Sequence, residues 1–572
     1  MTRRPRMSLA LVLIAALMLG SCGDGDAPPE SLTLLFWQAP SIANPYLSAG
    51  NKDTEAASLV LEPLANYDED GQLVPRLAAT IPTLENGGVS GDRMVVTWNL
   101  KSDVLWSDGT PLTAGDFVFT YGYGCALPEG NCENEPIERV EAVDDLTVRI
   151  TFRTPQPYPY TAFVGAGGVV LQETQFGACL GEEARRCERE NLYPIGTGPY
   201  KISDFRVDPM GATSEVVYVA NENFRVPDQP HFGEVVLQGG GSAFEAAQAV
   251  LEAGEADYAW NLQVEPDVLQ SLEGAGRGML VAAFASNVER LVVNFTDPDP
   301  AAGSGLEPSE WSREAPNPHP FLTDLNVRSA LSLAIDRGRI AGQLYGATGE
   351  PTCNLITAPS QYVSPHNDDC LEQDIAAADV LLEDAGWQIG SDGIREKEGV
   401  SLRILFQTST NSVRQTTQEL IREWWREIGV DTELKHIEAG EFFGGDPDLD
   451  TLGRFFADVQ MYTSGPGVDP QSHLGGWRTS EIARRENNWG GGNAPRWASP
   501  EYDALYEELE AASLGQERQD LVIQLNDLLV QNYVLIPLVN RATVSSAVSN
   551  DLKGVRLNPW DAELWNIHEW YR

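Results

Sequence analysis

The chain has 572 residues, of which 42% are hydrophobic and 9% aromatic, and its 84 acidic and 39 basic residues give a net charge of -45 at pH 7. This length exceeds what one hydrophobic core serves, and the composition excludes a disordered chain. The negative charge repels phosphate groups, so we expect no nucleic-acid partner and no binding to an anionic membrane surface.

An apolar run near the N-terminus ends at a lone cysteine. Three arginines precede about eleven apolar residues that end at Leu19, whereas a membrane-spanning helix needs roughly 20. This pattern predicts a secretory signal over 1–21. Its last residues and the cysteine, Leu19-Gly20-Ser21-Cys22, resemble the lipobox of bacterial lipoproteins, which implies a lipid on the Cys22 thiol. The alternative is an ordinary signal peptide with an accidental cysteine. Residues 22–30, with "GDGDAPPE", predict a flexible tether.

The next third of the chain predicts strands and helices in mixed order. Thr113 stands three residues before Asp116, which is typical of a helix N-cap. Asp70-Gly71 predicts a turn. From the hydrophobic periodicity we expect strands at 31–37, 92–106, 146–152 and 211–224, and helices at 54–64 and from 114 onward.

The remainder continues this alternation. Gly254 should end a helix that begins near Ser242. Other helices are expected at 326–345, 372–385, 415–428, 501–512 and 517–531, with strands at 290–295, 401–408 and 533–540. The predicted fold class is therefore α/β with mixed sheets.

The cysteines indicate an exported protein. Of the seven cysteines, lipidation of Cys22 leaves six, which allow 15 connectivities. Because closeness in sequence favours local pairs, we expect the disulfides Cys125–Cys132, Cys179–Cys187 and Cys353–Cys370. The alternative, a metal site, lacks the paired CxxC spacing of zinc ligands.

No catalytic pattern stands out. The six histidines form no HExxH pair, "IGTGPYK" is neither GxGxxG nor Walker A, and no GxSxG is present. Carboxylate pairs are so common in this acidic chain that each is expected to be solvated surface. We therefore expect no enzyme, no cofactor and no metal site, and a secreted hydrolase is the least favoured alternative.

Five segments together resemble one family. They are "VVTWNLKSDVLWSDGTPLTAGDFVFTY" (95–121), "YPIGTGPYKISDF" (193–205), "FLTDLNVRSALSLAIDRGRI" (321–340), "SPEYDALYEEL" (499–509) and "IPLVNR" (536–541). In this order they are similar to the extracytoplasmic solute-binding proteins of peptide-type (dipeptide and oligopeptide, family 5) ABC importers. Their glycines and caps identify the scaffold and need not touch a ligand.

The resemblance implies a two-lobed, periplasmic-binding-protein-like (type II) fold with an extra inserted domain. Lobe I would combine 31–64, 190–285 and 535–572, the extra domain would be 65–189, and lobe II would be 286–534. The strands at 290–295 and 533–540 would be the crossings between lobes. Ligand binding in such folds closes the lobes about a hinge.

The peptide anchors of dipeptide-binding relatives are missing from the matching stretch. In "MYTSGPGVDPQSHL" the anchoring aspartate falls on Gly465 or Pro466, although Asp469 fits the following Asp-Pro. The carboxylate-binding arginine falls near Thr408, and Arg414, six residues later, is either a substitute or an ordinary surface arginine. A buried ammonium without a carboxylate is costly, so dipeptide specificity is not expected.

The expected function is that of a lipid-anchored, extracytoplasmic receptor that captures oligopeptides and delivers them to a membrane permease, either on the outer face of the cytoplasmic membrane or in the periplasm. The alternative ligand is an oligosaccharide, which stacks on tryptophan and tyrosine faces, or another small solute. We expect a monomer. The candidate ligand-binding residues, each with an alternative role in a loop or in the core, are Trp37, Gln38, Asn411, Tyr462, Thr463, Ser464, Asp469 and Trp477.

Overall fold

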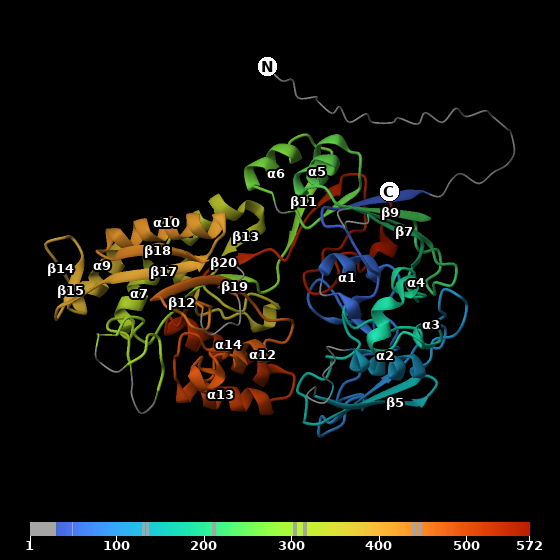
Figure 1. Ribbon diagram of the computed structural model, residues 1–572, viewed down its shortest axis with the longest axis horizontal. Helices are drawn as coiled ribbons and strands as arrows, with labels where there is room; N and C mark the ends of the chain where they lie inside the picture. Colours follow the sequence, from blue (N-terminus) through green and yellow to red (C-terminus); the bar gives the residue numbers. More distant parts are fainter. Residues whose placement is uncertain are drawn as a thin grey trace, which may run out of the picture.

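The computed structural model describes residues 30–572 except 49, 128–131, 133–135, 209–212, 263, 301, 303–305, 313–316, 438–441 and 444–448. The expected signal, Cys22 and all but the last residue of the tether lie outside the described residues. Two large bodies lie side by side (Figure 1). A smaller one, built around α2 and β5, lies below the body that contains α1, β7 and β9. Among the described residues no helix is both long and apolar enough to span a membrane.

Lobe I is built on a seven-stranded mixed sheet. Its strands, in spatial order, are β11 (Gly278–Ala283), β21 (Val544–Ser549), β10 (Tyr258–Trp260), β1 (Ser31–Phe36), β9 (Glu234–Gly239), β8 (Ser214–Ala220) and β7 (Tyr200–Val207). Strand β1 runs parallel to β9 and β10, and the other pairs are antiparallel. Helices α5 (Ala243–Gln248) and α6 (Pro266–Glu273) cover one face, and α1 (Asn51–Ser58) with the C-terminal segment covers the other.

Lobe II is built on a six-stranded mixed sheet in the order β13 (Gly349–Pro351), β20 (Leu535–Arg541), β12 (Val288–Val293), β19 (Val459–Ser464), β17 (Arg403–Ser409) and β18 (Asp431–Ile437). One face packs on α7 (Leu325–Leu333), α8 (Arg337–Ile340), α9 (Ile375–Asp384) and α10 (Ser412–Glu427). The other face packs on α13 (Pro500–Ala511) and α14 (Gln516–Gln531), with the short α12 (Gln471–Gly475) beside them. Figure 1 shows α10 above this sheet and α13 and α14 below it. Since both faces are covered, every residue of β12 is buried.

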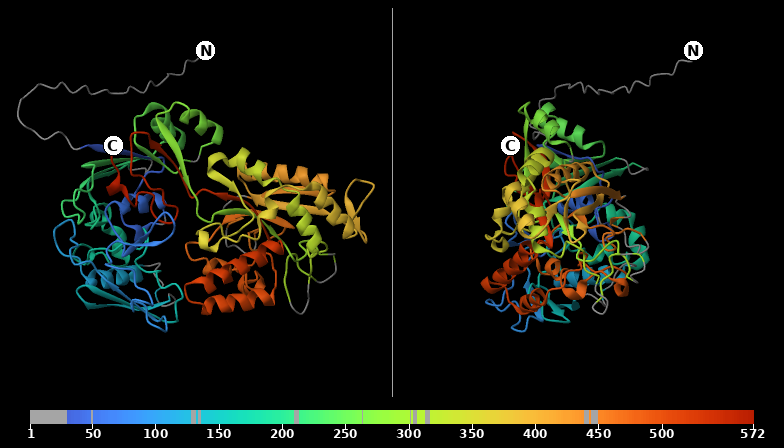
Figure 2. Two further views of the ribbon diagram at one scale, coloured as in Figure 1. Left: turned by 180° about the vertical axis from the view of Figure 1, so that it is seen from behind. Right: turned by 90° about the vertical axis from the view of Figure 1, so that its left-hand side faces the viewer.

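The extra domain holds an antiparallel sheet of β4 (Val95–Asn99), β6 (Thr147–Phe152) and β5 (Ile137–Asp144), covered by α2 (Ala114–Ala126). A hairpin of β2 (Ala65–Tyr67) and β3 (Leu73–Pro75) leads into it, and α3 (Glu173–Phe176) and α4 (Glu188–Leu192) follow it. The cap expected at Thr113 is confirmed, because its backbone N–H donates to Asp116 Oδ2 at 3.0 Å. A smaller antiparallel sheet, β14 (Gln388–Ile389), β15 (Arg395–Lys397) and β16 (Val400–Ser401), lies at the far end of lobe II (Figure 2).

Two neighbouring segments join the lobes. One runs from β11 to β12 and the other from β20 to β21. They are hydrogen-bonded to each other, since the Thr543 amide donates to the Ala283 carbonyl and the Arg541 amide to the Asn287 carbonyl, both at 2.9 Å. The sequence assigned 535–541 to lobe I, but β20 pairs with β12 and β13 in the sheet of lobe II. The chain therefore crosses after Arg541.

Two helices are shorter in the structure than the hydrophobic pattern of the sequence predicts. The helix expected at 54–64 ends at Ser58, since the chain then packs against the "IGTGPYK" segment: Gly198 N–H donates to the Val60 carbonyl at 2.8 Å. At Gly196 a Cβ atom would lie 1.9 Å from the same oxygen, so only glycine fits there. The helix expected at 326–345 breaks because Asp336 caps a new start at α8. The helix expected to end at Gly254 does so, with that residue in the left-handed conformation.

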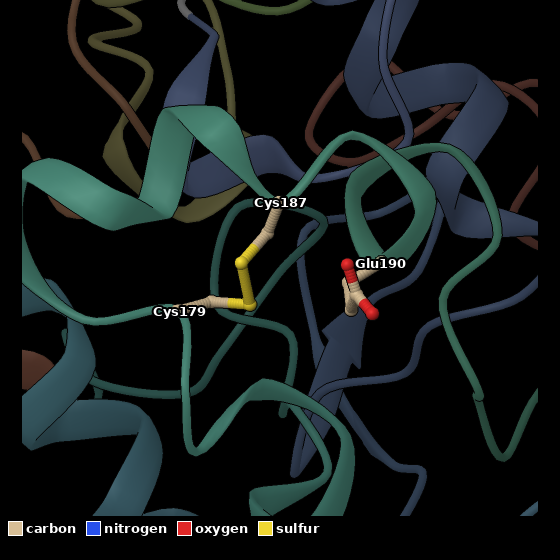
Figure 3. A group of neighbouring side chains, drawn as sticks. All are labelled: Cys179, Cys187 and Glu190. Carbon is tan, nitrogen blue, oxygen red and sulfur yellow. A yellow bond between two sulfur atoms is a disulfide. The ribbon is translucent and has the colours of Figure 1, made fainter.

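The six described cysteines pair as the sequence predicts. The sulfur–sulfur distances are 2.00 Å for Cys125–Cys132, 2.03 Å for Cys179–Cys187 and 2.10 Å for Cys353–Cys370. The bonds join cysteines that are 7, 8 and 17 residues apart in the sequence, so each closes a local loop. Glu190 lies beside the second pair, within 4.8 Å of both sulfurs, but the sulfurs are bonded to each other and are not thiolate ligands (Figure 3).

Candidate ligand-binding site

In lobe I, two of the expected ligand residues lie where a ligand is expected in an α/β sheet, just past the carboxyl end of a parallel strand. Trp37 and Gln38 follow β1, next to the end of β10. Trp37 is half-buried, and its indole Nε1 donates to the Asn261 carbonyl at 2.7 Å, whereas Gln38 is exposed. The hydrogen bond holds the indole against Asn261, the residue that follows β10.

A cavity of about 440 Å³ lies next to these strand ends, between lobe I and the extra domain. Its aromatic lining comes from Tyr67 at the end of β2, Trp260 at the end of β10 and Trp560 in the C-terminal segment. Thr543, between β20 and β21, also lines it. The cavity therefore reaches the crossing segments, and it has the size and aromatic lining of a small-molecule site.

Three carboxylates line this cavity: Glu55 on α1, and Asp561 and Glu563 in the C-terminal segment. Glu563 Oε2 accepts from Tyr258 Oη at 2.6 Å and from Ser546 Oγ at 2.7 Å. Glu55 Oε1 accepts from the Glu563 amide at 2.8 Å. No arginine or lysine nitrogen of the described residues lies within 4.0 Å of these carboxylates.

The environment of these three acids favours their neutral forms. Burial raises the pKa of Glu563 to about 7 and raises that of Asp561. Burial, with the adjacent Glu563, raises the pKa of Glu55 well above its usual value. The cavity wall therefore offers hydrogen-bonding oxygens and, once ionised, negative charge without a counter-ion from the described chain.

In lobe II, Asn411 and Thr463 meet around Arg414, on the face of the sheet that packs on α10. Asn411 caps α10 by accepting from the Arg414 amide at 3.0 Å. The Arg414 side chain pairs with buried Glu289 through Nε at 2.9 Å and donates to Thr463 Oγ1 at 3.2 Å. Arg541 Nη1 donates to the same hydroxyl at 3.0 Å. Arg414 is only 12% exposed, so it is no ordinary surface arginine, and its charge is already matched by Glu289.

Tyr462 and Ser464, the two neighbours of Thr463 in β19, point to the opposite face of the sheet, where Trp477, just after α12, also lies. The guanidinium carbon of Arg290 lies 4.9 Å from the Tyr462 ring centroid and 5.6 Å from that of Trp477. Arg290 Nη1 donates to the Ser464 carbonyl at 2.7 Å. Tyr462 and Trp477 are 6% and 4% exposed, so both belong to the lobe II core.

Asp469 lies in the loop after β19 and is paired within its own lobe. Arg518 Nη2, on α14, lies 2.7 Å from Oδ1 and 2.8 Å from Oδ2 of Asp469. This loop faces the extra domain: burial raises the pKa of Tyr67 and Tyr158, and the charge of Asp469 adds to the rise. The two tyrosine hydroxyls are themselves hydrogen-bonded at 3.1 Å.

The expected residues thus form three groups rather than one. Trp37 and Gln38 lie in lobe I, Asn411 and Thr463 lie on one face of lobe II, and Tyr462, Ser464, Asp469 and Trp477 lie on or beside the other. The sequence missed Glu55, Asp561 and Glu563, because it treated every carboxylate as surface. The signal available was "NPWDAELW" (558–565), where two acids stand among bulky apolar residues.

Comparison with known proteins agrees with this architecture. The family profile for bacterial extracellular solute-binding proteins, family 5, matches residues 72–476. The nickel-binding periplasmic protein of Escherichia coli is 27% identical over 500 residues, which cover 83% of each chain. A dipeptide-binding protein of Pseudomonas aeruginosa is 22% identical over 588 residues, covering 97% of this chain and 98% of the relative. The Bacillus subtilis oligopeptide-binding protein AppA, solved with a nonapeptide, superimposes with a TM-score of 0.62 at 19% identity, covering 95% and 99%.

The resemblance seen in the sequence motifs is therefore confirmed. The chain belongs to the family 5 solute-binding proteins, the peptide-type class of ABC importers. The fold, α/β with two lobes and mixed sheets, is that of the family's solved structures.

Proposed function

We propose that this protein is a lipid-anchored, extracytoplasmic receptor that captures oligopeptides between its lobes and delivers them to an ABC permease. The observation that carries the proposal is the cavity of about 440 Å³ between lobe I and the extra domain, lined by Tyr67, Trp260 and Trp560, which reaches the segments that join the lobes at Thr543. Aromatic walls accept varied side chains, and the buried acids beside them accept hydrogen bonds from peptide N–H groups.

Several contacts support an oligopeptide over a dipeptide ligand. A dipeptide must be held by its ammonium and carboxylate groups, because it has little else to bind. Here Asp469 is neutralised by Arg518, and Arg414 is neutralised by Glu289. A longer ligand held through its backbone and by roomy pockets does not need those two anchors.

The relatives that share the fold differ in cargo, since one is named for nickel and others for peptides. A thermal-shift screen separates these possibilities. Pools of tri- to nonapeptides, pools of oligosaccharides and a nickel–histidine complex are added separately to the purified protein. We expect a rise of several degrees with some peptides, because ligand at about 100 times its Kd stabilises the folded state by about 2.7 kcal/mol. A rise with oligosaccharides alone, or with the nickel complex alone, would overturn the peptide proposal.

The anchor is a separate part of the proposal and rests on Cys22 and the residues before it. A lipid on that cysteine, followed by the Gly-Asp-Gly-Asp-Ala-Pro-Pro tether, would keep the receptor beside its permease while the lobes move.

A further inference from the structure

A second cavity, of about 310 Å³, lies between the lobes, beside the segments that join them. One wall belongs to lobe I and consists of α6 and β11, with Ser545 of β21. The other wall belongs to lobe II and consists of residues 342 and 345–348, just before and at the start of the turn into β13. Figure 1 shows α6 above β13. This cavity is separate from the aromatic one, because α6 and α1 cover opposite faces of the lobe I sheet.

The two walls touch each other and a crossing segment. The turn η5 (Gly346–Thr348) lies against α6, and a Cβ atom added at Gly346 would lie 2.8 Å from Cβ of Pro266. Gly346 has a φ of +57°, so glycine suits this close approach. The Ala542 amide, between β20 and β21, donates to the Thr348 carbonyl at 2.9 Å. A change in the angle between the lobes therefore changes the shape of the cavity.

The lining of this cavity is apolar with two acids. Apolar side chains come from both walls: Leu262, Val264, Leu269, Leu280 and Tyr345. The acids, Asp267 and Glu273, lie on α6. The described residues that line the cavity include no arginine, lysine or histidine. An apolar body with one positive charge is therefore complementary to the lining, and the volume is at the lower end of the roughly 300–1,000 Å³ of small-molecule sites.

The two carboxylates have no cation of their own. No arginine or lysine nitrogen of the described residues lies within 4.0 Å of either. Glu273 Oε1 accepts from the Leu280 amide at 2.8 Å, which holds this carboxylate between α6 and β11. Asp267 is exposed and Glu273 is half-buried, so solvent screens their attraction for a cation. Apolar contact would supply most of the affinity, and the acids would select for the charge.

We infer that this cavity is a second ligand site, which takes a compact apolar amine and bridges the two lobes. The inference goes beyond the proposed function, because it needs no peptide in the other cavity. Since the walls come from different lobes, a ligand that contacts both stabilises the arrangement of the lobes seen here.

Tryptamine and tryptophol test the site, because they share an indole ring and differ in carrying an ammonium or a hydroxyl group. Binding of each to the full-length protein is measured by calorimetry. We expect saturable binding of tryptamine, about fivefold tighter than that of tryptophol, which is the gain from an ion pair near the surface. No saturable binding of either compound, or equal affinity for both, would overturn the inference.

A cavity-filling variant locates the bound molecule. Ala347→Trp fills the cavity from lobe II and should abolish tryptamine binding. Ala376→Trp, the same exchange at an exposed position of α9, is the matched control and should bind tryptamine as the wild type does. If Ala347→Trp does not fold, Gln270→Trp fills the cavity from α6 and takes its place. Unchanged tryptamine affinity in the folded cavity-filling variant would contradict the assignment.

The double variant Asp267→Asn/Glu273→Gln tests the wall of lobe I. It should bind tryptamine and tryptophol with equal affinity. Glu265→Gln changes an acid next to α6 that does not line the cavity, so this control should keep the preference for tryptamine. A preference kept in the double variant would contradict the role of the two carboxylates. These results do not depend on whether the protein binds peptides, so the two proposals fail separately.

Discussion

Arg518 Nη2 lies 2.7 Å from Oδ1 of Asp469, and the arginine is fully buried whereas the aspartate side chain is 16% exposed. This pair joins the loop after β19 to α14. Asp469 therefore serves its own lobe, and its charge is not free to hold a ligand ammonium.

The pair predicts a stability effect rather than a binding effect for Asp469→Asn. Losing the carboxylate leaves the Arg518 cation buried without a negative partner, although Gln471 and the Leu509 carbonyl still accept from it; breaking such a buried pair costs about 3–5 kcal/mol. Thermal or denaturant unfolding should show this loss, while peptide affinity at a temperature where the variant is folded changes little. Glu510→Gln is the control, because its contact with Arg478 is 3.8 Å and solvent-exposed. An Asp469→Asn variant as stable as the control, but unable to bind, would mean that Asp469 is a ligand anchor after all.

The buried acid Glu563 predicts a falling stability with rising pH. Its pKa is raised from 4.5 in the unfolded chain to about 7 in the folded state, so its contribution is fully present below about pH 4.5 and is lost as pH rises through about 7. Glu563→Gln should flatten this part of the melting-temperature profile between pH 5 and 8. The exposed Glu182→Gln variant should keep the wild-type dependence of melting temperature on pH. If Glu563→Gln kept it as well, Glu563 would not be the group responsible.

A contact between the extra domain and lobe II predicts that Arg93 favours the closed arrangement. Arg93 Nη1 and Nη2 donate to the carbonyls of Ala512 and Ala511 at 3.2 Å and 3.1 Å, where α13 ends. Because a partly exposed, charge-assisted contact is worth about 1 kcal/mol, Arg93→Ala should weaken ligand binding about fivefold. Small-angle X-ray scattering should show a larger radius of gyration without ligand. Arg139→Ala, on the exposed side of β5, should change neither the ligand affinity nor the radius of gyration. If this control changed both as much as Arg93→Ala does, the Arg93 contact would have no role.

The anchor predicts a simple chemical result at Cys22. Cells grown with labelled palmitate should incorporate label into the wild-type protein and not into Cys22→Ser, and the variant should leave the membrane fraction. Label in the variant, or a variant that stays on the membrane, would contradict lipidation at this residue.

Much of the fold follows from local sequence rules. Thr113 with Asp116 predicts the start of α2, Gly254 predicts a helix end, and neighbouring cysteines predict all three disulfides. The assignment of β20 failed, because pairing with β12 is a long-range contact that no local pattern encodes.

The site was harder to predict for the same reason. Trp37 lies at the expected strand end, but the partners that decide the roles of Asp469 and Arg414 come from distant segments, Arg518 on α14 and Glu289 on β12. Glu55 and Glu563 are more than 500 residues apart and become one cluster only in the folded lobe.

The central claim, that the protein carries peptides, is tested most directly by native mass spectrometry of the protein purified from its own cells. The account predicts bound species that are released on denaturation and fragment into amino-acid residue masses, and that are depleted from a Trp560→Ala variant of the cavity wall. Bound species that fragment as sugars, or that carry a metal and no peptide, would contradict it.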